Sequence, residues 1–363
     1  MTETRIDVTA SAGRVYPVLL AEGLLGRLGT VLDQLGIARR RVLMSTPPIW
    51  QLVSPLIAGL PADTEPMLMG DGERYKTLTS VSRLYDGLVR AGVDRASVVV
   101  AVGGGVLGDT AGFAAATYLR GLAVVQVPTT LLAQVDSAIG GKVGVNLTAG
   151  KNLVGAFHPP AAVIVDPLVL KSLPRREFRA GLYEVVKYAV IADASLFERL
   201  EHTLAAIFAR DPGALLPVIA ECCRIKARVV SEDEHEHGIR RTLNFGHTAA
   251  HALEAITRYR RFRHGEAVGY GMLAAAHLAH ARGALSLDAR DALATLIAHM
   301  GPLPPVADLS AADALDVMRR DKKVIGGTLH FVLPTSIGTT SVVTDVTERE
   351  LTSALLGIGL RET

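Results

Sequence analysis

Three histidines in the second half of the chain have a spacing that suggests metal binding. His247 and His251 are four residues apart, so they lie on one face if their segment is helical. His264 follows in a turn rich in arginine, directly before a second apolar run. Imidazole rings that two helices bring together commonly bind a divalent metal. The spacing differs from the His-Glu-x-x-His pattern of metalloproteases, so peptide hydrolysis is not the first hypothesis.

An acidic residue in an earlier apolar segment is a candidate for a further ligand. Glu184 and Lys187 are three residues apart and share one face of the predicted helix Glu177–Ile191. One interpretation is an ion pair within this helix. The other is that Glu184 joins the histidines, since a Glu/His/His set leaves coordination positions open, as catalytic sites do. The residues alone leave open whether Glu184 or His251 completes the site.

A glycine-rich turn in the first half is typical of a nucleotide-binding site. The apolar run Ser97–Val102 leads into the sequence Gly-Gly-Gly-Val-Leu-Gly-Asp of residues 103–109, which fits the spacing G-x-G-x-x-G. Glycines let the backbone approach a pyrophosphate, whose charge a helix N-terminus favours. The alternative is a tight strand–helix turn without a ligand. Thr129 and Thr130 follow the next strand, where their hydroxyls could contact a cofactor or cap a helix.

Charged residues stand among glycines between residues 134 and 152. Asp136, Lys142, Lys151 and Asn152 lie in this segment, and its basic side chains could converge on a phosphate. The alternative is a glycine-rich surface loop with solvated lysines.

A second charged segment lies between the helical runs of the second half. Lys226 and Arg240 flank the acidic run 232–236 and could bind a substrate carboxylate. Such a run is usually a solvated helix end. Acidic residues of this run could instead supply a general base or support the histidine ligands.

The composition limits the classes of function. A length of 363 residues suggests about two domains, and 49% hydrophobic with 20% charged residues fits a globular enzyme. A net charge of +2 and 5% aromatic residues argue against a nucleic-acid partner. The only cysteines, Cys222 and Cys223, are adjacent, so no disulfide framework is expected. No signal peptide or membrane-length apolar run is visible, so we expect a cytoplasmic protein without membrane association.

The elements that must position these residues change in character near residue 172. Residues 1–172 predict a Rossmann-like, nucleotide-binding α/β domain with a mainly parallel sheet. Its predicted strands are Val15–Leu20, Arg41–Ser45, Ser97–Val102, Leu122–Val127 and Ala162–Val165. Residues 173–363 predict a mainly helical domain that binds metal and substrate. Its predicted helices are Glu177–Ile191, Pro212–Glu232, Leu243–Ile256, Ala267–Ala281 and Asp288–His299, with β-like runs at Thr328–Pro334 and Thr340–Thr344.

Taken together and in this order, the motifs resemble those of the 3-dehydroquinate synthase family of sugar-phosphate cyclases. The resemblance runs from about residue 73 to residue 338. The matching stretches are residues 72–76, 103–109, 127–137, 140–142, 150–152, 184–187, 243–248, 264–266 and 321–323.

The resemblance implies a lyase of the shikimate pathway that depends on NAD⁺ and on Zn²⁺ or Co²⁺. Its substrate would be 3-deoxy-D-arabino-heptulosonate 7-phosphate, and its products 3-dehydroquinate and phosphate. In this family NAD⁺ transiently oxidises a ring alcohol, phosphate is eliminated, the hydride returns, and an intramolecular aldol step closes the ring. The metal would polarise the reacting oxygens as a Lewis acid.

The resemblance also implies roles for individual residues. It assigns the metal to Glu184, His247 and His264, so His251 becomes a substrate residue. Cofactor contacts are implied for Glu73, Lys76, Gly104, Gly105, Val106, Asp109, Thr129, Thr130, Asp136, Lys142 and Lys151. Substrate contacts are implied for Arg120, Asp136, Lys142, Asn152, Lys187, Lys226, Arg240, Asn244, His251 and either Lys322 or Lys323. Catalytic roles are implied for Lys142, Lys187, Glu236, Arg240, Asn244 and His251.

Two of these implications concern proton transfer and assembly. Glu236 and His251 match an acid–base pair, although the leaving phosphate could itself act as the base. Arg120 matches an arginine that reaches the site of a partner subunit, which implies a homodimer. The segment Met44–Pro48 lacks the Asp or Asn that often contacts the adenosine ribose in this family.

Two alternative functions and one non-catalytic role remain to be weighed. Another sugar-phosphate cyclase would use the same cofactors but needs no cations for a carboxylate, such as Lys226 and Arg240. A metal-dependent polyol dehydrogenase would not need so many basic residues around its substrate. A binding module that lost its activity would be expected to lack some of these groups.

Overall fold

The computed structural model describes residues 3–10, 13–38, 40–60, 65–236, 238–322 and 329–363. The chain forms two units: unit 1 contains Met1–Pro174 and Arg210–Glu234, and unit 2 contains Arg175–Ala209 and His235–Thr363. The first stretch of unit 1 ends at Pro174, close to the boundary predicted after residue 172. No sequence signal predicts the return to unit 1 at Arg210, because a helical pattern does not say what the helix packs against. The side chain of Lys322 and the whole of Lys323 lie outside the described part.

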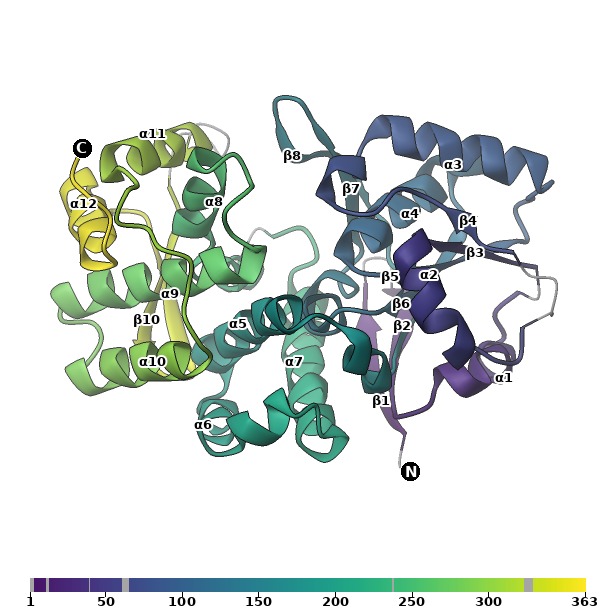
Figure 1. Ribbon diagram of the computed structural model, residues 1–363, viewed down its shortest axis with the longest axis horizontal. Helices are drawn as coiled ribbons and strands as arrows, with labels where there is room; N and C mark the ends of the chain where they lie inside the picture. Colours follow the sequence, from purple (N-terminus) through teal and green to yellow (C-terminus); the bar gives the residue numbers. More distant parts are fainter. Residues whose placement is uncertain (1–2, 11–12, 39, 61–64, 237, 323–328) are drawn as a thin grey trace. The chain divides into compact units, whose positions relative to one another are not determined.

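Unit 1 is built on a sheet whose described strands follow the order β1 (Thr4–Thr9), β2 (Val15–Leu20), β9 (Ala162–Val165), β6 (Ala123–Pro128), β5 (Val98–Gly103), β3 (Arg41–Ser45) and β4 (Met67–Leu68) (Figure 1). Neighbouring strands are parallel except β1 and β2. The predicted α/β fold with a mainly parallel sheet is thereby confirmed. β5 and β9 are buried along their whole length, which fits their valine-rich sequences, since both faces of a central parallel strand are covered.

Helices and short turns connect these strands. The helices of unit 1 are α1 (Leu28–Gln34), α2 (Pro47–Val53), α3 (Leu78–Arg90), α4 (Gly105–Thr117) and α7 (Pro212–Glu232). Short helical turns are η2 (Leu25–Arg27), η3 (Ser54–Leu56), η4 (Glu73–Tyr75), η5 (Tyr118–Arg120) and η7 (Pro167–Ser172). α4 packs very closely against β6. A Cβ on Gly108 of α4 would lie only 2.8 Å from Oε1 of the buried Gln126 of β6.

The segment after β6 is more regular than its glycine-rich sequence suggests. It forms the π-helical turn η6 (Ala133–Ser137) and then an antiparallel hairpin of β7 (Lys142–Leu147) and β8 (Gly150–Phe157). The Nε2 group of Gln134 donates to the carbonyl oxygens of Pro128 and Asp166, which fixes the π-helical turn at the sheet. The predicted alternative of a glycine-rich surface loop is therefore wrong for most of this segment.

Unit 2 is mainly helical, as predicted (Figure 1). Its elements are α5 (Arg175–Ala192), α6 (Ala194–Phe208), η8 (Ile239–Asn244), α8 (His247–Ile256), α9 (His264–Ala281), α10 (Leu287–His299), α11 (Ala311–Lys322), α12 (Glu348–Gly357) and the antiparallel strands β10 (Phe331–Ser336) and β11 (Thr339–Val343). α9 contacts α5, α8, α10, α12 and β10, and it is rich in buried alanine and glycine. It is therefore the helix around which the unit packs.

The helix predicted over Leu243–Ile256 is interrupted. η8 ends at Asn244, and α8 begins only after Gly246, which has a φ of +78°. This left-handed conformation is strained for other residues, so the glycine allows a sharp turn between the two elements. No helix in the described part of the chain combines the length and apolar character needed to cross a membrane.

Candidate active site

In unit 2, a carboxylate and two imidazoles from three helices converge. Glu184 comes from α5, while His247 and His264 are the first residues of α8 and α9. One potential ligand atom of each lies within 4.8 Å of the others. Glu184 Oε1 lies 3.8 Å from Nε2 of His247 and 3.6 Å from Nε2 of His264. Residues far apart in the sequence are thus brought to the spacing of a shared cation.

Two glycines permit this convergence. A Cβ on Gly265 would lie 1.8 Å from the carbonyl oxygen of Ala180 in α5. A Cβ on Gly246 would lie 2.9 Å from the backbone nitrogen of Met272 in α9. The starts of α8 and α9 therefore approach neighbouring backbones more closely than any larger residue would allow.

The imidazoles are oriented by their other ring nitrogens. Nδ1 of His247 lies 3.1 Å from the carbonyl oxygen of Phe245, so Nδ1 is the protonated nitrogen that donates. Nδ1 of His264 lies 3.2 Å from Oε2 of Glu254. Such partners fix the tautomer in which Nε2 carries the lone pair that can bind a metal. The role of Glu254 is not predicted from the sequence, although it follows His247 and His251 on the same face of α8.

The electrostatics of the cluster also suit a cation. Lys187 Nζ lies 2.6 Å from Glu184 Oε2, so the ion-pair interpretation of these two residues is confirmed. Glu184 is fully buried, and its Oε1, which faces both imidazoles, has no hydrogen-bond partner in the described part of the chain. Burial, followed by the charge of Lys187, holds the pKa of His247 well below its usual value. The neutral imidazole is the form that binds metals, and a cation would satisfy the carboxylate oxygen.

Apart from Lys322, at the end of α11, the remaining residues predicted in unit 2 lie on η8, on α8 or in the segment before them. The ring centroid of His251 is 5.6 Å from that of His247 and 6.1 Å from that of His264. Asn244 Nδ2 donates to Glu236 Oε1 at 2.5 Å. Arg240 is only 2% exposed, which is unusual for a guanidinium. The metal-ligand, acid–base and substrate roles of these residues stay predictions.

In unit 1, the glycine turn lies at the carboxyl end of β5. Gly104 is the N-cap of α4, and Gly105 is its first residue. A Cβ on Gly104 would lie 3.0 Å from Thr130 Cγ2, and one on Gly105 would lie 2.9 Å from Ser137 Oγ. Thr129 N donates to the Gly103 carbonyl, which joins the two loops. Thr130 Oγ1 accepts a hydrogen bond from Ala133 N at 3.2 Å, so this hydroxyl does serve as a helix cap.

Several predicted residues of unit 1 form one hydrogen-bonded network. Lys76 Nζ donates to Asp109 Oδ2 at 2.5 Å and to Asn152 Oδ1 at 2.6 Å. Asn146 Nδ2 donates to Glu73 Oε1 at 2.8 Å, and Asn152 N donates to Asn146 Oδ1 at 2.9 Å. Burial raises the pKa of Asp109, while the charge of Lys76 opposes this shift. Asn146 belongs to this network but is not among the predicted site residues.

A second pair in unit 1 joins residues from η6 and α7. Lys226 Nζ forms a close ion pair with Asp136 Oδ1, and Lys226 is 7% exposed. Lys142 and Lys151 lie on the two strands of the β7–β8 hairpin.

Two further predictions of unit 1 concern the surface and the β3 edge. Arg120 is exposed, with a φ of +67°, and it lines a surface hollow of about 520 Å³ with Arg14 and His158. Thr46 Oγ1 donates to Asp71 Oδ1 at 3.2 Å. The segment after β3, which has no Asp or Asn of its own, therefore lies beside a carboxylate from another loop.

Comparison with known proteins identifies the family. Family models described as 3-dehydroquinate synthase N-terminal and C-terminal match residues 66–180 and 181–324. The 3-dehydroquinate synthase of Solibacter usitatus is 44% identical over 339 residues, which are 92% of this chain and 94% of that protein.

Two solved structures are similar over most of their length. ValA, the 2-epi-5-epi-valiolone synthase of Streptomyces hygroscopicus subsp. jinggangensis 5008 with NAD⁺ and Zn²⁺ bound, has a TM-score of 0.87 and 32% identity and covers 97% of this chain and 98% of its own. A 2-deoxy-scyllo-inosose synthase complexed with carbaglucose-6-phosphate, NAD⁺ and Co²⁺ has a TM-score of 0.85 and 27% identity. It covers 97% of this chain and 99% of its own. The two family models and the identity to a curated relative confirm the resemblance in the motifs, and the chain belongs to the 3-dehydroquinate synthase family.

Proposed function

We propose that this chain converts 3-deoxy-D-arabino-heptulosonate 7-phosphate into 3-dehydroquinate and phosphate, with NAD⁺ and a divalent metal. Membership of the family supports the reaction. The observation that carries the proposal is the set Glu184, His247 and His264. A buried Glu184 carboxylate oxygen, without a hydrogen-bond partner among the described residues, faces the Nε2 atoms of both imidazoles.

The donor set supports Zn²⁺ or Co²⁺ as the metal. Two imidazole nitrogens and one carboxylate oxygen suit either ion and leave coordination positions open for substrate oxygens. The similar structures named above hold Zn²⁺ in one case and Co²⁺ in the other. A metal bound here would supply Lewis-acid polarisation of those oxygens. Burial and the charge of Lys187 hold the pKa of His247 low, while Phe245 and Glu254 orient the two imidazoles.

The glycine turn supports NAD⁺ as the cofactor that accepts and returns a hydride. Gly104, Gly105 and Val106 would bring backbone N–H groups of α4 to its pyrophosphate. Thr129 and Thr130 lie on the adjoining loop. A side chain at position 104 would press against Thr130 and reduce the space between the two loops. The network of Glu73, Lys76 and Asp109, together with Asp136, Lys142 and Lys151, completes the proposed cofactor contacts.

The substrate's two anionic groups require cations, and the chain has candidates for both. We assign the phosphate to Lys142, Asn152, Asn244 and His251, and the carboxylate to Lys226 and Arg240. Lys187 and Asp136 are further substrate contacts in this proposal, as is Lys322. Arg240 is nearly completely buried, a position in which a guanidinium is seldom found.

Proton transfer is assigned to Glu236 and His251. The side-chain amide of Asn244 donates a hydrogen bond to Glu236 Oε1, which holds this carboxylate in place. The departing phosphate is the alternative base, since it leaves beside the carbon that loses a proton.

The protein is proposed to act as a homodimer. Arg120, exposed at the rim of the hollow with Arg14 and His158, would reach the site of the partner subunit. A cytoplasmic location is part of the same proposal.

A cyclase that makes a cyclitol from another sugar phosphate is the alternative, and the similarity to the two solved synthases favours it as the second candidate. Phosphate release separates the two. The account expects release from the heptulosonate phosphate that requires both NAD⁺ and a divalent metal and stops on addition of a chelator. Release only from sugar phosphates that lack a carboxylate would support the alternative instead.

A further inference from the structure

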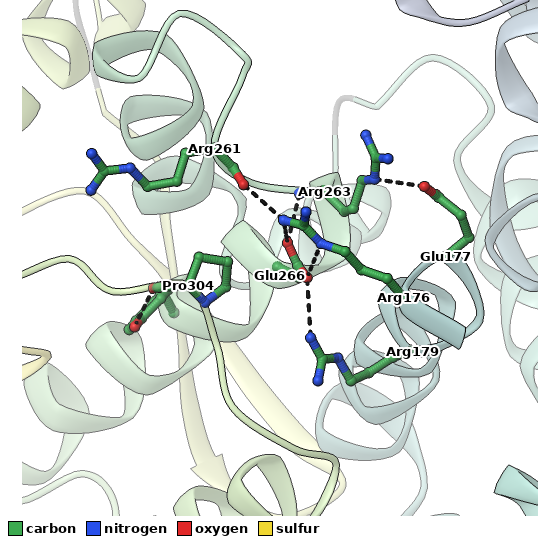
Figure 2. Close-up of polar contacts among 8 residues, drawn as sticks. Arg176, Glu177, Arg179, Arg261, Arg263, Glu266 and Pro304 are labelled. Atoms are coloured by element: carbon green, nitrogen blue, oxygen red, sulfur yellow. Dashed lines mark hydrogen bonds and ion pairs between the residues drawn. The ribbon is translucent and has the colours of Figure 1, made fainter. Parts of the chain in front are cut away.

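Glu266 is a carboxylate buried at the beginning of α9. It is the third residue of the helix and is fully buried. Figure 2 shows the side chains of Arg176 and Arg179, from α5, pointing toward it. Arg176 Nε donates to Oε1 at 2.8 Å, and its Nη2 donates to Oε2 at 2.7 Å. Arg179 Nη2 donates to Oε1 at 3.3 Å, and the backbone nitrogen of Arg263 donates to Oε2 at 2.8 Å.

These contacts join the two helices that carry metal-site residues. His264 is the residue with which α9 begins, two positions before Glu266, while Arg176 and Arg179 precede Glu184 on α5. Gly265, between the two α9 residues, approaches the α5 backbone at Ala180 so closely that no side chain fits. The bidentate pair thus holds α9 against α5 at the point where His264 faces Glu184.

Burial of the Glu266 carboxylate with two arginines costs more free energy of desolvation than a contact that only stabilises packing needs to. Burying a carboxylate requires compensation by several donors, and apolar residues of similar volume often stabilise a protein as well. Arg179 Nε and the nearby Tyr183 hydroxyl are buried without a hydrogen-bond partner in the described part of the chain. A bidentate arginine–carboxylate pair supplies fixed geometry as well as energy. A role in geometry therefore accounts for the cluster better than a role in stability alone.

We propose that Glu266, held by Arg176 and Arg179, is a positioning residue that fixes His264 relative to Glu184 and thereby sets the affinity of the site for a divalent metal. This inference rests on the proposed metal site. Glu266 touches neither the metal nor the substrate, so it acts through the position of α9.

A matched control exists at the other end of α9. Glu350 is the third residue of α12, accepts a hydrogen bond from the backbone nitrogen of Thr347 at 2.8 Å, and pairs with both Nε and Nη2 of Arg282. Arg282 is the C-cap of α9. Glu350 therefore makes the same kind of contact to the same helix without approaching His264.

The test is a titration of the metal-free full-length protein with Co²⁺, followed by visible absorption, for the wild type, Glu266→Gln and Glu350→Gln. Urea unfolding of the metal-free proteins records the stability that each substitution removes. We expect Glu266→Gln to weaken Co²⁺ binding by about 10- to 100-fold, as loss of a group that orients a ligand does, and to alter the Co²⁺ spectrum. Glu350→Gln should lose stability but keep the wild-type affinity and spectrum.

The inference is overturned if Glu266→Gln binds Co²⁺ as the wild type does. It is also overturned if both variants weaken binding by the same factor, since the effect would then follow general destabilisation. If Glu266→Gln does not fold, Arg176→Lys takes its place, because lysine keeps the charge but loses the bidentate geometry. Arg176→Lys should weaken Co²⁺ binding in the same direction, and wild-type affinity in this variant overturns the inference. A wild-type protein that binds no Co²⁺ contradicts the proposed metal site itself.

Discussion

Glu254 and His264 form a carboxylate–imidazole pair, with Glu254 Oε2 3.2 Å from Nδ1 of His264. The opposite nitrogen of the same ring faces Glu184 at 3.6 Å. The pair joins α8 to α9 and aims the Nε2 lone pair toward the carboxylate. His264 is thus oriented by one carboxylate and is expected to share a cation with another.

Replacement of His264 by alanine should abolish metal binding and activity while the protein still folds. The side chain is 33% exposed, so its removal leaves no large cavity in the core. Metal content by elemental analysis and thermal unfolding by circular dichroism are the measurements. His202→Ala, in an exposed position of α6, is the control and should keep both metal and activity. Wild-type metal content in His264→Ala would remove this residue from the ligand set.

Replacement of Arg240 by alanine should mainly weaken substrate binding. Loss of a charge-assisted contact to the substrate carboxylate corresponds to roughly 1.5–3 kcal/mol. The measurement is steady-state kinetics, where KM should rise much more than kcat falls. Arg241→Ala, the neighbouring and less buried arginine, is the control and should change KM little. Unchanged KM and kcat in Arg240→Ala would exclude the carboxylate role.

Replacement of Gly265 by alanine should separate α9 from α5. The new Cβ would lie 1.8 Å from the Ala180 carbonyl oxygen, so the backbone must move. Overpacking of this kind costs about 1–3 kcal/mol of stability, and the displaced His264 should bind metal more weakly. Gly26→Ala, where nothing lies within 4 Å of the new Cβ, is the control. Urea unfolding and metal titration test both effects, and wild-type metal affinity in Gly265→Ala would argue against the close-approach explanation.

The Glu350–Arg282 pair should make stability depend on acid pH. Hydrogen bonds from Arg282 lower the pKa of Glu350 from 4.5 to about 2. The ionised form is thus favoured in the folded state, so this stabilisation is complete above pH 4.5 and is lost as the pH falls toward 2. The difference in unfolding free energy between the wild type and Glu350→Gln should be largest near neutral pH and shrink below pH 4.5. Urea unfolding over this pH range measures it, and a constant difference would contradict the shift.

Much of the fold follows from the sequence alone. The bounds of β2, β3 and β9 agree with the predicted strands, since each is a short, mostly apolar run of strand length. The hairpin of β7 and β8 is harder to predict because its glycines and lysines obscure the alternation of a strand. α6 is not among the predicted helices, although Asp193 accepts hydrogen bonds from the nitrogens of Ser195 and Leu196 and so caps its start.

Site residues can be predicted from the sequence where a local motif indicates their chemical role. His247, His264 and the glycine turn belong to this group. The pairing of Lys226 with Asp136 depends on how α7 packs against η6, which no local pattern specifies. Glu254 and Glu266 look like ordinary glutamates on helices, and only the burial of their carboxylates distinguishes them from solvated ones.

The most direct test of the proposed function follows phosphate release and NADH absorbance in the same reaction. The protein, loaded with Co²⁺ or Zn²⁺ and supplied with NAD⁺, is mixed with the heptulosonate phosphate. Because the hydride is returned within each turnover, the account predicts steady phosphate release with no net accumulation of NADH. NADH that grows in step with substrate consumption, without phosphate release, would contradict it and identify a dehydrogenase.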